Sequence, residues 1–320
     1  MDPRDHHPNT RVCLFTNSSH WWMKCRRSVC TLRRLFPDVC KNLGPVICFS
    51  ATLAVMVLYA MADQLRSFVA GIFIPQYHYP FAVPVTFFQV LVTLICLLLL
   101  HAVGLAPLKP YSLSLGEQLL VPSICGSAQV LLGVWADASA HSGMYPLTMA
   151  LLPILCVGWS HGMHLAVPPS VRLTGLITVI TVASVGITAS QGLPKVELLE
   201  CLCSAMALIF HSLSLTWLAK VAETERHSSG HVSPFDLYYT LIVNQSLVLG
   251  FLCLLHPDSP RALGDGNWHS LLFIGYLLTI LLLEALQCLL VDMTAMVVSP
   301  LAAALLHTAR RLTTPFYSIL

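Results

Sequence analysis

The sequence predicts an all-α membrane protein that crosses the bilayer several times, and two observations carry this prediction. Of the 320 residues, 56% are hydrophobic and only 10% are charged, whereas soluble domains carry about 25% charged residues. The apolar runs are also continuous and of roughly the 17–25 residues that a membrane-spanning helix needs. A chain of this composition cannot cover a soluble surface, so its helices must face lipid.

Nine apolar runs follow one another along the chain. Eight of them have the length of complete spans, and the ninth is interrupted by His307, Arg310, Arg311 and Pro315. The runs cover residues 45–62, 80–105, 117–136, 145–166, 173–190, 197–218, 234–256, 268–291 and 294–320. Most connections are short, and the longer ones are 63–79, 219–233 and 257–267.

The first 43 residues are basic and contain no apolar run. They hold eight Lys/Arg and three acidic residues, so the positive-inside rule places them in the cytosol and no cleavable signal peptide is expected. With this orientation the cytosolic side holds twelve Lys/Arg and the opposite side three, namely Arg66, Lys195 and Arg261. We therefore predict a cytosolic tail, 1–43, and a transmembrane domain, 44–320.

Arg310 and Arg311 are the first candidates for a functional site. A cation at membrane depth costs at least a few kcal/mol, so it usually faces a watery cavity or binds an anion. The guanidinium group matches phosphate oxygens bidentately, which favours phosphate binding. In the alternative interpretation the ninth helix stops at Leu306 and both arginines extend to the membrane surface.

Other polar side chains in the apolar runs are further candidates. Glu284 and Gln287 lie one turn apart, share a helix face and are expected to line a cavity. Gln89 and Gln129 either line that cavity or join helices by hydrogen bonds. Tyr238 and Tyr239 either contact substrate or belong to the aromatic belt at the membrane surface.

Two acidic residues in or near these runs have other expected roles. Asp63 and Arg66 are spaced i,i+3 and are able to form an ion pair. Asp292 is expected at a helix end.

Five segments together resemble the drug/metabolite transporter superfamily, in its nucleotide-sugar and triose-phosphate translocator branch. The similarity covers roughly residues 45–320, and its order and spacing are more specific than any one segment. The matching segments are Tyr79–Gln89, Tyr145–Pro153, Gly186–Ser190, Ser233–Tyr239 and Val298–Arg311.

This resemblance implies ten helices in two inverted five-helix repeats, about 44–192 and 193–320 here, with the substrate site between them. It implies a secondary antiporter, without cofactor or metal, in the Golgi or ER membrane. The implied substrates are nucleotide-sugars or other phosphorylated organic anions, exchanged for a monophosphate or phosphate. The phosphate-binding role falls on Arg310 and Arg311.

The chain departs from the family pattern at three places. Met149 stands where many members have a lysine, and Asp63 with Arg66 stands where an Asn-Lys pair is usual. The sequence also ends within the ninth expected helix, which leaves about eight or nine of ten. These departures keep open a non-transporting, truncated or regulatory protein of the same fold.

Other functional classes are less well supported by the sequence. A membrane-embedded enzyme using Asp137, His161 or His164 is a second alternative, although we expect no enzyme. Nothing in the sequence predicts nucleic-acid binding, and homodimerisation is left open.

Overall fold

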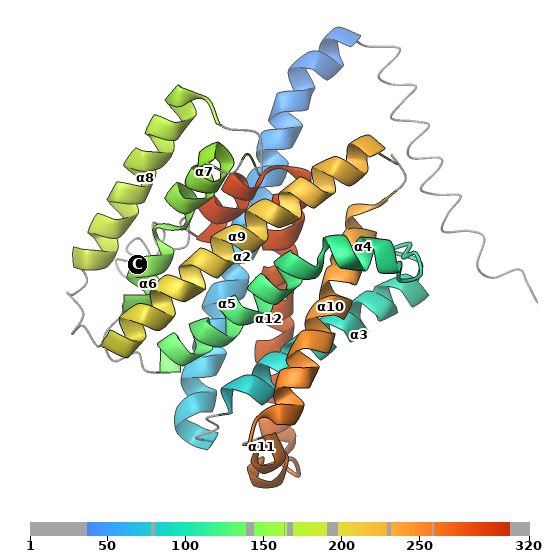
Figure 1. Cartoon of the computed structure of the whole chain (residues 1–320), viewed down its shortest axis with the longest axis vertical. Coiled ribbons are helices and arrows are strands. Elements are labelled where there is room, and N and C mark those ends of the chain that lie inside the picture. The colour runs from blue at the N-terminus through green and yellow to red at the C-terminus, as the bar shows by residue number, and fades with distance from the viewer. Residues whose placement is uncertain are drawn as a thin grey trace, which may run out of the picture.

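The described part of the protein consists of helices, with no strand. This computed structural model describes residues 37–77, 81–138, 144–162, 164, 169–190, 198–228, 232–257 and 259–307. Most of residues 1–43, together with Arg310 and Arg311, lie outside the described residues. The helices, drawn in Figure 1, are α2 (Pro37–Tyr77), α3 (Ala82–Ala102), α4 (Leu113–Gln118), α5 (Leu120–Ala138), α6 (Met144–Met149), α7 (Leu152–Gly162), α8 (Val171–Ser190), α9 (Leu198–Ser228), α10 (Pro234–Leu255), α11 (Ser259–Asp265) and α12 (Leu271–Val297), followed by helical residues 300–307.

Several of these helices are long and apolar enough to cross a membrane. Among the described residues there are five such segments: Thr52–Phe73, Val83–Ala102, Leu198–Ser228, Pro234–Leu255 and Leu271–Val297. Two shorter apolar segments, Leu120–Ala136 and Val171–Ile187, accompany them. The prediction of an all-helical protein is therefore confirmed, and the length and composition of these segments fit a multi-pass membrane protein.

Two predicted connections are wrong because the helices continue through them. The segment 63–79 was expected to be a loop, but α2 runs unbroken to Tyr77, since the residues after Arg66 are again mostly apolar. The segment 219–233 was also expected to be a loop, but α9 continues to Ser228, because Ala, Lys, Glu and Arg are strong helix formers. Consequently Arg66 lies within a helix and not in a connection.

The fourth apolar run is interrupted where a single helix was expected. Instead of one span over 145–166, α6 ends at Met149 and α7 begins at Leu152. The amide of Leu151 donates to the carbonyl of Thr148 at 3.0 Å, which tightens the chain at the break. Pro153 lies in the first turn of α7, where its missing N–H costs nothing.

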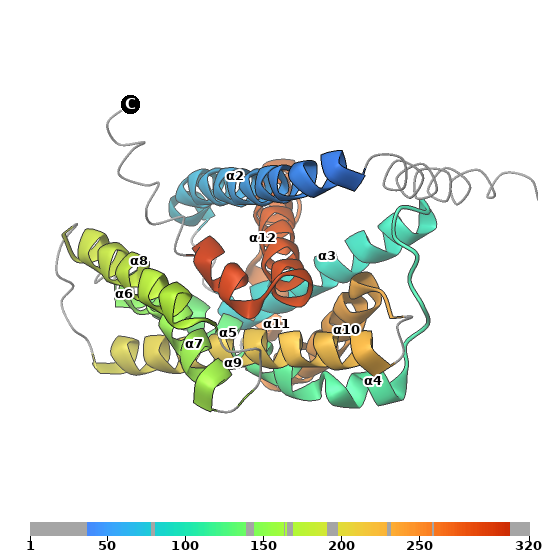
Figure 2. The ribbon, with the colours of Figure 1, turned by 90° about the horizontal axis from the view of Figure 1, so that it is seen from above.

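Helix α12 occupies the middle of the bundle. It contacts α2 on one side, α3 on another, and α9 and α10 on the far side, an arrangement visible from above in Figure 2. Helix α8 lies at the edge, beside α6 and α7. The remaining extensive contacts join α5 to α9, α3 to α10, and α5 to α10.

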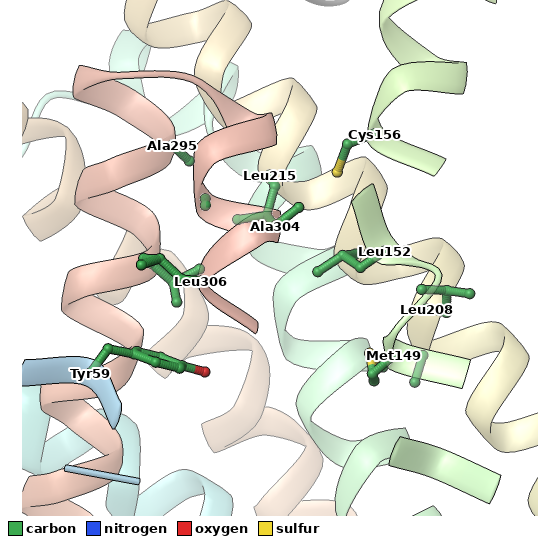
Figure 3. Close-up of a cluster of buried hydrophobic side chains, with 12 residues drawn as sticks. Tyr59, Met149, Leu152, Cys156, Leu208, Leu215, Ala295, Ala304 and Leu306 are labelled. Atoms are coloured by element: carbon green, nitrogen blue, oxygen red, sulfur yellow. The ribbon is translucent and has the colours of Figure 1, made fainter. Parts of the chain in front are cut away.

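A buried apolar cluster joins both halves of the chain at one side of this bundle. Tyr59 from α2, Leu152 from α7, Leu215 from α9 and Ala295 from α12 contribute side chains (Figure 3). Ala304, from the helical residues 300–307, is fully buried in the same cluster. Alanine at such a contact lets two helix backbones approach closely, so the 300–307 segment is held against the core.

The start of α10 is fixed by a capping box. Ser233 accepts from the amide of Phe235 at 3.3 Å, and Asp236 accepts from the amide of Ser233 at 3.1 Å. The same carboxylate accepts from the amide of Lys109 at 2.8 Å. The segment after α3 is thereby anchored to the start of α10, and both lie at one end of the bundle.

Candidate functional site

A central cavity of about 210 Å³ lies within the bundle. Its walls come from α2, α3, α5, α6, α9, α10, α12 and residue 307 of the following helical segment. Ligand pockets usually have volumes of roughly 300–1,000 Å³, so this space accommodates only a small group. The charged and polar side chains among its lining residues make this cavity the candidate functional site.

Four of the predicted site residues meet in this cavity. Gln89 from α3 and Gln129 from α5 line it, together with Glu284 and Gln287 from α12. Glu284 and Gln287 therefore share an inward face, as their spacing predicts. Met149, at the position where the resemblance expects a lysine, also lines the cavity.

The two predicted tyrosines are not among the described lining side chains. Tyr238 is fully buried in an apolar cluster between α3, α9 and α10, and Tyr239 is half-buried. The cavity lining includes neither tyrosine. Arg310 and Arg311 lie outside the described residues, so their role stays a prediction.

An arginine that the sequence placed outside the membrane lies in the cavity. Arg66 is the only Lys/Arg among the described lining residues. Its Nη2 lies 3.8 Å from Asp63 Oδ1, as the i,i+3 spacing predicts, and its Nη1 lies 3.7 Å from Glu284 Oε1. The cavity thus contains an ionic group that links α2 to α12.

Two histidines and a tyrosine form a second polar group. The Nε2 atoms of His211 and His307 lie 3.2 Å apart, and Tyr59 Oη lies 3.2 Å from His307 Nδ1. The two imidazole rings are perpendicular, with centroids 4.9 Å apart. All three side chains line the cavity, so α2, α9 and the 300–307 segment are joined by side-chain hydrogen bonds.

Two glycines on α5 keep room for polar neighbours in this cavity. A Cβ at Gly133 would lie 2.7 Å from Tyr145 Oη, and a Cβ at Gly126 would lie 2.7 Å from Gln245 Nε2. Both positions line the cavity. A larger side chain at either position would displace a polar group or fill the space.

Sequence reasoning missed several of these residues. Arg66 was assigned to a connection, although the apolar residues that follow it are a signal that the helix continues. Asp292 was expected at a helix end, but it lies inside α12, five residues before Val297, and lines the cavity. His211 carried no local signal, since its partner His307 is 96 residues away in the chain.

The two histidines named as alternative enzymatic residues lie elsewhere, and the side chain of Asp137 is outside the described part of the structure. His161, at the end of α7, and His164 are both exposed, and neither lines the cavity. The cavity itself offers one arginine, two carboxylates, two imidazoles and several amides and hydroxyls. Such a set has the chemical groups to form ion pairs and hydrogen bonds with a polar or charged solute.

Comparison with protein-family models and with curated proteins finds no match to this chain.

Proposed function

We propose that this protein is a secondary antiporter of nucleotide-sugars or related phosphorylated organic anions across an endomembrane. The observation that supports it best is the polar cavity in the centre of an apolar helix bundle. Ionisable residues at membrane depth are costly and usually mark a solute or ion pathway. Here Arg66 and Glu284 lie in one such cavity together with Gln89, Gln129 and Gln287, the three glutamines that the sequence predicted there.

The helix contacts support an inverted-repeat architecture for this carrier. Suppose that α2, α3 and α5 of the first repeat are equivalent to α9, α10 and α12 of the second. Exchanging the repeats then turns the α5–α9 contact into the α12–α2 contact and the α5–α10 contact into the α12–α3 contact. The α3–α10 contact is unchanged by the exchange. All of these contacts are present, whereas the α9–α12 contact has no extensive counterpart between α2 and α5. Carriers built from inverted repeats bind their solute at the repeat interface, and helices of both proposed repeats contribute residues to this cavity.

The assignment of a phosphorylated substrate rests on the sequence resemblance and on Arg310 and Arg311. Arg310 follows His307 by three residues in the chain, and His307 lines the cavity. Arginine suits phosphate because its planar fork matches two oxygens at once. We therefore propose that the two arginines bind the phosphate group of the substrate.

The size of the cavity requires a change of shape during transport. A volume of about 210 Å³ is smaller than a pocket for a drug-sized molecule, which begins at roughly 300 Å³. A nucleotide-sugar therefore enters only when the helices around the cavity separate on one side. Alternating access, in which one repeat moves against the other around a central site, provides this opening.

Transport by purified protein in liposomes tests the proposal. Vesicles loaded with nucleoside monophosphates should take up the corresponding radiolabelled nucleotide-sugar from a panel of such sugars. Arg310→Ala should abolish this uptake, whereas Arg172→Ala, on the exposed start of α8, should leave it unchanged. Uptake that is absent for every substrate of the panel would refute the function, and full uptake by Arg310→Ala would refute the assigned role.

A further inference from the structure

The ionic group around Arg66 contains two carboxylates that differ in their surroundings. The Asp63 side chain is 7% exposed, and Gln287 Nε2 donates to its Oδ1 at 3.2 Å. The Glu284 side chain is 25% exposed and lines the cavity. Asp63 is therefore fixed on the same helix as Arg66, whereas Glu284 faces Arg66 from α12 at the cavity wall.

The pair of Arg66 with Glu284 is an ion pair without a short hydrogen bond. Its Nη1–Oε1 distance of 3.7 Å exceeds the roughly 2.7–3.2 Å of a direct N–H···O bond. The Arg66 side chain is 27% exposed, so a solute in the cavity can reach it. A ligand oxygen at hydrogen-bond distance would interact more strongly with the guanidinium than this carboxylate does.

We propose that Arg66 is a second anion-binding group of the cavity, and that Glu284 is the counterion which a ligand phosphate displaces. This inference rests on the proposed carrier function and adds a substrate contact on α2 that the resemblance does not supply. The ligand class is a phosphate or diphosphate group. Asp63 stays beside Arg66 throughout, so it partly offsets the positive charge.

The number of acceptor oxygens explains why a phosphate is favoured over a simple monovalent anion. Glu284 remains attached to α12 after its displacement, so any bound anion adds negative charge to a group that already holds Asp63 and Glu284. A phosphate offsets this repulsion because it offers several acceptor oxygens that match the guanidinium bidentately. Glu284 thus lowers the affinity of the site for anions, because each anion must displace its carboxylate from Arg66. The loss is overcome best by a phosphate, so Glu284 contributes to specificity for phosphate.

The two residues should have opposite effects on affinity, and binding of inorganic pyrophosphate to the purified protein measures them. Isothermal titration calorimetry in detergent at pH 8 gives the Kd. Arg66→Gln should weaken binding roughly 10- to 100-fold, the effect of losing a charged hydrogen bond. Glu284→Gln should strengthen binding about fivefold, the upper value for a partly exposed ion pair.

Two further variants make the interpretation specific. In the double variant Arg66→Gln with Glu284→Gln, pyrophosphate should bind as weakly as in Arg66→Gln alone, because Glu284 acts through Arg66. Arg172→Gln and Glu223→Gln change the same residue types at exposed positions of α8 and α9, and both should match the wild type. If Arg66→Gln does not yield a monodisperse protein, Arg66→Lys is titrated in its place. This variant retains the positive charge but loses the planar fork that binds two oxygens at once.

The outcomes separate this site from the carrier function. Unchanged or weaker binding in Glu284→Gln would overturn the role of the counterion, and unaltered binding in Arg66→Gln would overturn the anion site. An absence of pyrophosphate binding to the wild type would also overturn the anion site. Pyrophosphate binding with the expected pattern, combined with no exchange of any nucleotide-sugar, would keep the anion site and reject the carrier.

Discussion

His211 and His307 face each other across the cavity wall, with their Nε2 atoms 3.2 Å apart. A hydrogen bond at this distance requires one Nε2 to carry a proton and the other to accept it. Tyr59 contacts the remaining nitrogen of His307, and the phenol can donate or accept. The three side chains therefore tie α9 and the 300–307 segment to α2, which comes from the other half of the chain.

Loss of this contact should destabilise the protein. His211→Phe keeps most of the side-chain volume but removes the hydrogen bond to His307, and His211 is only 8% exposed. We expect a loss of about 1–3 kcal/mol, the penalty for leaving a buried polar partner unsatisfied. The measurement is the melting temperature in detergent, with His269→Phe as the control at an exposed position. Equal melting temperatures for both variants would contradict a stabilising role for the histidine pair.

Filling the cavity should block transport without unfolding the protein. Gly133→Val places new methyl groups where Tyr145 Oη already lies 2.7 Å from an ideal Cβ. We expect the exchange rate in liposomes to fall roughly tenfold or more, since small misplacements at a site have large effects. Gly275→Val on α12, where no atom lies within 4 Å of the added Cβ, provides the matched control. An active Gly133→Val protein would mean that the solute does not use this cavity.

The capping box at the start of α10 gives a prediction about stability. Asp236→Ala removes the acceptors for the amides of Ser233 and Lys109, and should cost about 2 kcal/mol. Asp236→Asn retains one acceptor oxygen and should cost about half as much. The measurement is the melting temperature of both variants, compared with that of the exposed control Glu223→Ala. The idea fails if the asparagine variant is as unstable as the alanine variant.

The orientation of the bundle can be tested with glycosylation. The charge distribution predicts that residues 229–231, between α9 and α10, face the cytosol and that α11 faces the opposite side. An Asn-Gly-Ser acceptor inserted after Gly266 should be glycosylated in microsomes, whereas the same insertion after Ser229 should not. The reverse pattern would invert the topology that we predict and place the basic tail on the other side.

The sequence was most informative about the helices and about the polar residues within them. Long apolar runs predicted the helices, because burial in lipid imposes composition over a whole span. Polar residues in those runs predicted part of the cavity lining: Gln89, Gln129, Glu284 and Gln287 all lie there. Each is costly in lipid, so its position alone indicated an internal partner.

The sequence was least informative about helix ends and about pairs of distant residues. Arg66 was placed outside the membrane because a charge resembles the end of a span, yet its ion pair with Glu284 allows it to lie inside. That pair, like the His211–His307 contact, joins residues far apart in the chain. Only the packing of α2 and α9 around α12 brings such side chains together.

The unbroken course of α2 has a mechanical consequence for the whole molecule. Its 41 residues extend about 60 Å along the helix axis, roughly twice the hydrocarbon thickness of a bilayer. Arg66 is therefore carried on the same helix as the turns that begin at Pro37, with Pro45 between them. We expect a change in the tilt of α2 against α12 to change the distance between the guanidinium of Arg66 and Glu284.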